Sequence, residues 1–213
     1  CLVGSEMCIR DSSRGYPLSR GMAGGKAGPV PIVCGRGEKM TGRLGRARCI
    51  FWKGRVLPMR ILVVSDTHGN DSSLRRAILA QPKAEVVIHL GDGEEELLRA
   101  KRAFPEKMFL AVRGNCDFGS DLPLTGEFTA QGVKIFYTHG HYYGVKSGLY
   151  TFACAARERG AQVALYGHTH NALEDYDDGL YLLNPGSLNS WEATYGTVDI
   201  TPQGIVTNIV KLP

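Results

Sequence analysis

Five short apolar runs, each followed by a residue type that binds metal ions, constrain the fold of this chain more than any other feature. Runs of this length between glycines or polar turns are typical of buried strands. In open α/β sheets, ligands bind outside the carboxyl ends of such strands. The sequence therefore predicts a metal site at those ends. The runs are Ile61–Val64, Val86–Ile88, Phe109–Val112, Val133–Tyr137 and Val163–Tyr166, and the residues that follow them are Asp66, His68, Asp92, Asn115, His139, His168 and His170.

The spacing of these residues supports a shared cavity. Asp66 and His68 lie two positions apart, as do His168 and His170. In extended chain, residues i and i+2 point to the same side. Glycines beside the candidate ligands allow a strand end to turn sharply around an ion. One such fragment is weak support, but five fragments after five strands indicate a site that holds two metal ions.

Charge is unevenly distributed along the 213 residues. Residues 1–58 contain 11 Lys and Arg against 3 Asp and Glu, whereas residues 59–213 contain 14 Lys and Arg against 18 Asp and Glu. The second part is mildly acidic, which argues against tight binding of nucleic acid or an anionic membrane. It holds two isolated cysteines, Cys116 and Cys154, which predicts a reducing cytoplasm. The chain lacks an apolar stretch long enough for a membrane span.

Residues 1–58 are expected to lie outside the folded domain. The first 12 residues resemble a translated sequencing adaptor, and the segment holds 11 of the 27 glycines without a sustained apolar period. Such a composition buries too little surface to offset its chain entropy. We expect a disordered or artefactual leader, and favour this over a transit peptide. Residues 59–213 are expected to form one domain.

The pattern after Met59 predicts two packed sheets with helices outside. Helices are expected after Asn70 or Asp71, up to Pro82, and from Glu94 to Pro105, so the first half reads as βαβαβ and favours a parallel sheet. The second half predicts hairpins over 127–137 and 171–183, a helix over 147–159, and closing strands over 194–200 and 205–210.

The motif order is similar to that of a known family. D-x-H, G-D, G-N-C-D, T-H-G-H and G-H-T-H, in this order over residues 59–213, resemble the calcineurin-like metallophosphoesterase superfamily, and in particular the small bacterial phosphodiesterases of the YfcE type. The resemblance implies an α/β fold, a four-layer α/β/β/α sandwich of two mixed sheets flanked by helices. It also implies one metal ion held by Asp66, His68 and His170, a second held by Asn115, His139 and His168, and Asp92 bridging the two.

Nitrogen and oxygen ligands without a thiolate favour Mn²⁺, with Zn²⁺, Fe, Co²⁺ or Ni²⁺ as alternatives. Two such ions about 3.5–4 Å apart share a hydroxide and stabilise an in-line displacement at phosphorus. The group that protonates the leaving oxygen stays open. Many relatives have a His directly after the Asn, whereas this chain has Cys116. We favour His141 for phosphate contact or proton donation, and expect Cys116 to line the wall of the pocket. Asp117 is expected to orient a neighbouring ligand. The predicted catalytic set is therefore Asn115, Cys116, Asp117 and His141.

The predicted function is hydrolysis of a small phosphate ester, preferably a phosphodiester, by a cytoplasmic, metal-dependent enzyme. A phosphomonoesterase and a nuclease of the same superfamily are the enzymatic alternatives. A non-catalytic scaffold similar to the retromer subunit of this fold is the third. The expected partner is a small phosphorylated substrate, with no membrane and no nucleic acid, and homo-oligomer formation stays open.

Overall fold

The computed structural model describes residues 58–213. The prediction of a leader over 1–58 lies outside the described residues, apart from Pro58. The described chain forms ten strands, three α-helices and one short 3₁₀-helix. None of its helices combines the length and apolarity needed to cross a lipid bilayer.

The first sheet has five strands in the order β10-β9-β1-β2-β3. Its centre is parallel, because β1 pairs with β2 and β2 with β3 in the same direction. Strands β9 and β10 extend it in antiparallel fashion beside β1. The bounds are β1 Met59–Val64, β2 Ala84–His89, β3 Met108–Ala111, β9 Thr194–Thr201 and β10 Gly204–Lys211.

The second sheet also has five strands, in the order β4-β5-β6-β8-β7. Strands β5, β6 and β8 are parallel, and the edge strands β4 and β7 pair with their neighbours as antiparallel hairpins. Both sheets are therefore mixed, as predicted. The bounds are β4 Thr125–Ala130, β5 Val133–Thr138, β6 Val163–Leu165, β7 Leu173–Asp177 and β8 Leu180–Asn184.

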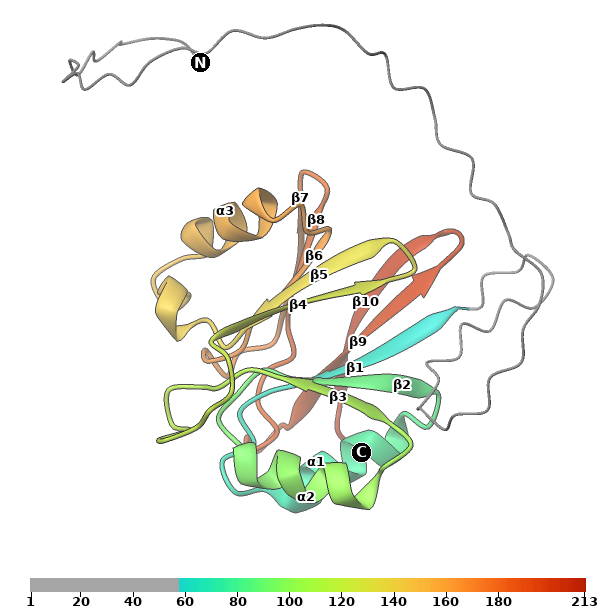
Figure 1. Cartoon of the computed structure of the whole chain (residues 1–213), viewed down its shortest axis with the longest axis vertical. Helices are drawn as coiled ribbons and strands as arrows, with labels where there is room; N and C mark the ends of the chain where they lie inside the picture. The colour runs from blue at the N-terminus through green and yellow to red at the C-terminus, as the bar shows by residue number, and fades with distance from the viewer. Residues whose placement is uncertain (1–57) are drawn as a thin grey trace, which may run out of the picture. The chain divides into compact units, whose positions relative to one another are not determined.

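Helices cover the outer face of each sheet and complete the predicted four layers (Figure 1). Helices α1 (Asp71–Ala80) and α2 (Glu94–Ala103) pack on the first sheet, and α3 (Tyr150–Glu158) packs on the second. Asn70 is the N-cap of α1, because its side chain accepts the N–H of Ser73 at 3.1 Å. This cap satisfies one of the free N–H groups at the helix start.

Strand β1 shows why the apolar runs in the sequence are continuous rather than alternating. Ile61 and Val63 point into the core between the two sheets. Leu62 and Val64 point the other way, into the core beneath α1 and α2. Successive side chains of a strand face opposite sides, and here both sides are apolar cores. A strand that is buried on both faces must be apolar at every position.

The predicted helix over 147–159 begins only at Tyr150. It is preceded by a 3₁₀-helix, His141–Tyr143, which the sequence pattern did not predict. Glycines account for the difference, because Gly140, Gly144 and Gly148 adopt φ values of 105°, 62° and 150°. Backbone at positive φ interrupts a right-handed helix. The resulting turns place His141 on a short, separate element beside the strand ends.

Candidate metal centre

The turns that carry the candidate ligands have strained backbone. Seven non-glycine residues of the described chain have positive φ, and five of them are candidate ligands. Such a conformation is uncommon for residues other than glycine, and clusters of it mark functional sites. The φ values are 54° for Asp66, 41° for His68, 58° for Asp92, 68° for His168 and 60° for His170. These backbone conformations direct the five side chains toward a shared site at the strand ends.

Asp66 is fully buried and has one oxygen without a hydrogen-bond donor. Its Oδ2 accepts the hydroxyl of Ser65 at 2.5 Å and the N–H of His168 at 3.1 Å. Its Oδ1 has no hydrogen bond, although Nε2 of His170 lies 3.0 Å away and Nε2 of His68 3.7 Å away. A buried carboxylate oxygen without a donor is costly, and a cation held between these three groups would remove that cost.

Asp92 lies between the two predicted ligand sets. Its Oδ1 accepts the N–H of Cys116 at 2.7 Å. Its Oδ2 lies 3.8 Å from Nε2 of His68 and 3.4 Å from Nε2 of His139. His139 in turn lies 3.0 Å from the side-chain oxygen of Asn115, and its Nδ1 faces the carbonyl of Leu90 at 2.8 Å. That carbonyl orients the ring, so that Nε2 points into the site.

His168 and His141 complete the cluster on the side of the second sheet. The ring centroid of His168 lies 5.0 Å from that of His139 and 6.0 Å from that of His141. Burial, together with neighbouring His139 and Lys146, lowers the pKa of His168 to about 4. Burial and His139 also lower the pKa of His141, whose Nδ1 is buried without a hydrogen-bond partner. Neutral imidazoles are the form that binds metal ions.

The donor set fits a divalent transition metal. Three groups of side chains have ligand atoms that all lie within 4.8 Å of one another. Carboxylates and imidazoles are the ligands that Mn²⁺, Zn²⁺ and Fe²⁺ take in proteins. One group coincides with the first set implied by the resemblance, and the others share Asp92. The groups are Asp66, His68 and His170; Asp66, Asp92 and His139; and His68, Asp92 and Cys116.

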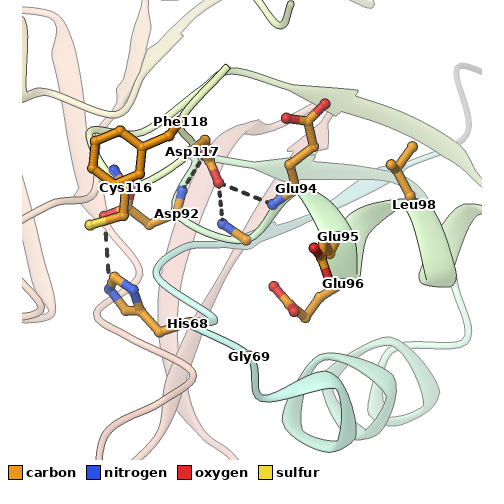
Figure 2. Close-up of a pocket in the computed structure, with 11 residues that line it drawn as sticks. His68, Gly69, Asp92, Glu94, Glu95, Glu96, Leu98, Cys116, Asp117 and Phe118 are labelled. Carbon is orange, nitrogen blue, oxygen red and sulfur yellow. Dashed lines mark hydrogen bonds and ion pairs between the residues drawn. The ribbon is translucent and has the colours of Figure 1, made fainter. Parts of the chain in front are cut away.

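Asp117 contacts backbone rather than a ligand side chain. Its carboxylate accepts four N–H groups at 2.7–3.2 Å, which belong to Asp92, Gly93, Glu94 and Gly114. Figure 2 shows the bonds from Asp92 and Glu94. Burial alone would raise its pKa, but these four bonds outweigh burial and lower it. Helix α2 has no side-chain cap of its own. Asp117 therefore caps α2 from another loop and fixes the turn that carries Asp92.

Cys116 and Asn115 are exposed at the opening of the site. The side-chain nitrogen of Asn115 lies 3.2 Å from the sulfur of Cys116. Burial, followed by a hydrogen bond with Asp92, raises the pKa of the thiol. A raised pKa favours the thiol over the thiolate.

A cavity of about 430 Å³ adjoins the cluster (Figure 2). His68, Asp92 and Cys116 line it on the side of the candidate ligands, together with exposed Phe118. The first turn of α2 lines the remainder with three glutamates, Glu94, Glu95 and Glu96. This acidic wall disfavours any ligand that carries many negative charges.

Three residues outside the predicted set support the site. The hydroxyl of Ser187 donates to the carbonyl of Asp66 at 2.9 Å, which places the Asn184–Ser187 turn against the site. Thr67 and Glu96 are buried behind the ligands and share a 3.2 Å hydrogen bond. A serine, a threonine and a glutamate are ordinary surface residues in a sequence, so only the fold reveals these contacts.

The layers and the histidine–carboxylate cluster define a class of metal-dependent hydrolase folds. The chain belongs to the calcineurin-like phosphoesterase superfamily, because the model of the calcineurin-like phosphoesterase superfamily domain matches residues 59–203. It is thus a member of a family of hydrolases that act on phosphoric ester bonds, as the resemblance implied.

Named relatives agree with this membership. The probable metallophosphoesterase YsnB of Bacillus subtilis is 38% identical over 132 residues, which cover 61% of this chain and 75% of YsnB. Phosphodiesterase YfcE of Escherichia coli strain K12 is 28% identical over 169 residues, or 66% of this chain and 88% of YfcE. Vacuolar protein sorting-associated protein 29 of Schizosaccharomyces pombe is 29% identical over 134 residues, or 61% of this chain and 72% of that protein.

A solved structure extends the likeness to three dimensions. The crystal structure of a predicted phosphoesterase from Streptococcus pneumoniae TIGR4 superposes with a TM-score of 0.63 and 26% sequence identity. The match covers 73% of this chain and 91% of the other. The two-sheet sandwich is therefore the fold of this family.

Proposed function

We propose that this protein hydrolyses a small phosphodiester at a centre of two divalent metal ions. The arrangement of Asp92 carries the proposal, because its Oδ2 faces His68 on one side and His139 on the other. A carboxylate is the ligand type that can contribute to two cations at once. In this proposal Asp66, His68 and His170 hold one ion, Asn115, His139 and His168 hold the other, and Mn²⁺ is the preferred metal.

The ions, when bound, supply an activated water and neutralise the charge of the phosphate. The side chains of the protein position the ligands and protonate the leaving oxygen. Asp117 holds the Asp92 turn through the N–H of Asp92 at 2.8 Å. His141, whose Nδ1 has no protein partner, contacts the phosphate or donates a proton to the leaving oxygen. Cys116 stays as the second candidate for that proton, because it lines the same cavity and the pKa of its thiol is raised.

The acidic wall of the cavity favours a small substrate with a single phosphate over a polynucleotide. Glu94 and Glu95 would repel the flanking phosphates of a polynucleotide. A nucleic-acid groove instead needs basic side chains that follow the backbone, and the residues that line this cavity include no Lys or Arg. We therefore favour hydrolysis of a small phosphodiester over nuclease activity.

The test compares two chromogenic esters on the full-length protein. After metal removal with a chelator, the protein is assayed with bis(p-nitrophenyl) phosphate and p-nitrophenyl phosphate under Mn²⁺, Zn²⁺, Co²⁺ and Ni²⁺. We expect the diester with Mn²⁺ to give the highest kcat/KM. Asp92→Asn should lose about 100-fold or more in kcat/KM. Asp121→Asn, an exposed matched control, should keep the parent value. Equal rates for Asp92→Asn and the parent would rule out the bridging role.

Non-catalytic scaffolding is the second candidate, and the likeness to vacuolar protein sorting-associated protein 29 favours it. The complete set of seven candidate ligands argues for the enzyme. Turnover separates the two: a protein that binds Mn²⁺ but hydrolyses neither ester is a scaffold. We also place the protein in the cytoplasm, because Cys116 and Cys154, its two described cysteines, are both free. Cell fractionation tests that location, and size-exclusion chromatography tests for a homo-oligomer.

A further inference from the structure

The two turns that carry Asp66, His68 and Asp92 are joined by a buried threonine. Thr67 is fully buried, and its hydroxyl oxygen lies 3.3 Å from the carbonyl of Asp92 and 3.2 Å from Oε2 of Glu96. Nε2 of His89 lies 3.4 Å from the same oxygen. One hydroxyl thus contacts the end of β2, the turn after it and the first turn of α2.

The direction of these hydrogen bonds follows from the tautomer of His89. The N–H of Gly91 donates to Nδ1 of His89 at 3.2 Å, so the hydrogen of the neutral ring lies on Nε2 and points at Thr67. The threonine hydroxyl accepts that hydrogen and keeps its own for Glu96. A charged acceptor makes the stronger bond. Glu96 is in turn held by Arg99, which donates to Oε1 at 2.8 Å.

The packing leaves space for this arrangement only because position 93 is a glycine. A Cβ at Gly93 would lie 1.7 Å from the hydroxyl oxygen of Thr67 and 2.9 Å from Oε2 of Glu96. The φ of Gly93 is 165°, which lies outside the left-handed region that favours glycine. The glycine is required because the threonine occupies the space.

We infer that Thr67 is a positioning residue, whose hydroxyl ties the turn after β1 to Glu96 in the first turn of α2, next to the turn that carries Asp92, and thereby sets the affinity for metal ions. This role rests on the proposed metal centre. Both turns have positive φ, so their geometry depends on contacts from outside. Backbone bonds from Asp66 to Gly91 and from His68 to Asp92 contribute to the same junction. The hydroxyl adds the link to α2, which those bonds do not provide.

The experiment measures binding of Mn²⁺ rather than turnover. Chelator-stripped, full-length protein is titrated with Mn²⁺ by calorimetry. Thr67→Ala should weaken binding about 10-fold or more, within the range found when outer contacts of metal ligands are removed. Thr67→Ser restores the oxygen and should bind within about 3-fold of the parent. Gly93→Ala should weaken binding as Thr67→Ala does, because the added methyl group displaces the hydroxyl without removing it.

Thr207, on the edge strand β10, provides a matched control. It is buried and donates to Oε1 of Glu174 at 2.5 Å, so Thr207→Ala also removes a threonine–glutamate bond. That variant should lower the melting temperature and leave Mn²⁺ affinity unchanged. Parent-like Mn²⁺ affinity in both Thr67→Ala and Gly93→Ala would overturn the role of Thr67 alone. A parent protein that binds no Mn²⁺ would overturn the proposed metal centre, and this role with it.

Discussion

The carboxylate of Asp117 accepts the backbone N–H of Asp92 at 2.8 Å, so a side chain from the loop after β3 holds the backbone of the loop after β2. The same carboxylate accepts the N–H of Gly93, Glu94 and Gly114. A side chain that carries N–H groups could not replace this carboxylate, because it would face four backbone donors. The negative charge of Asp117 is therefore built into the turn that presents Asp92.

Asp117→Asn should destabilise the protein by about 2–3 kcal/mol, because the amide NH₂ would face backbone N–H groups that need an acceptor. Metal affinity should fall at the same time, since the Asp92 turn loosens. Urea unfolding of the stripped protein and titration with Mn²⁺ measure the two effects. Asp121→Asn, an exposed change in the same loop region, is the control. Unchanged stability in Asp117→Asn would contradict the cap.

The source of the leaving-group proton can be read from the dependence on the leaving group. If His141 donates it, His141→Ala should lose about 100-fold in kcat/KM on phenyl diesters. It should lose much less on p-nitrophenyl diesters, whose leaving group departs without a proton. Cys116→Ala should behave like the parent on both. If kcat/KM instead depends steeply on the leaving group in Cys116→Ala and only weakly in His141→Ala, the thiol donates the proton.

Acidification should destabilise the metal-free protein through His89. Burial lowers the pKa of His89 from 6.5 to about 4. Between those values the unfolded chain binds a proton at His89 and the folded protein does not. Stability is therefore complete above pH 6.5 and falls toward pH 4, by roughly 3 kcal/mol from this group.

Urea unfolding from pH 7.5 to about 4 in the presence of a chelator measures this slope. In His89→Gln the slope should be shallower by the contribution of His89. His168, whose pKa is also about 4, contributes equally to both proteins and cancels in the comparison. Identical slopes for the parent and His89→Gln would show that His89 is not held neutral.

Removal of metal should lower stability, because Asp66 and Asp92 are buried carboxylates that face one another across the site. Mn²⁺ at about 100 times its Kd should raise the free energy of unfolding by about 2.7 kcal/mol per site. Asp92→Asn should lose most of that increment and Asp121→Asn should keep it. Calorimetric melting with and without a chelator is the measurement. A parent melting temperature that does not respond to Mn²⁺ would contradict the metal centre.

The fold was predictable where apolar runs and turns are unambiguous. Ile61–Val64 reads as a strand because both of its faces enter a core. Asn70 and Pro82 bracket α1 because capping and proline geometry are local properties. The separate 3₁₀-helix at His141 was not predicted, since a glycine at positive φ has the same sequence symbol as any other glycine.

The sequence predicted which residues gather at the site, but it did not predict the hydrogen bonds that hold them. The structure brings the seven candidate ligands to one place, and their metal-binding roles remain predictions. Asp117 was expected to orient a ligand, and it holds the backbone of Asp92 rather than a ligand side chain. Thr67 and Glu96 escaped notice, because a hydrogen bond between residues 29 positions apart has no local pattern.

Both sheets contribute candidate ligands: Asp66, His68, Asp92 and Asn115 follow strands of one sheet, and His139, His168 and His170 follow strands of the other. A cation held by both halves would act as a clasp across the sandwich. Metal binding and packing of the two sheets would then be linked reciprocally. A change that separates the sheets would weaken metal binding, and metal binding would stabilise the packing of the sheets.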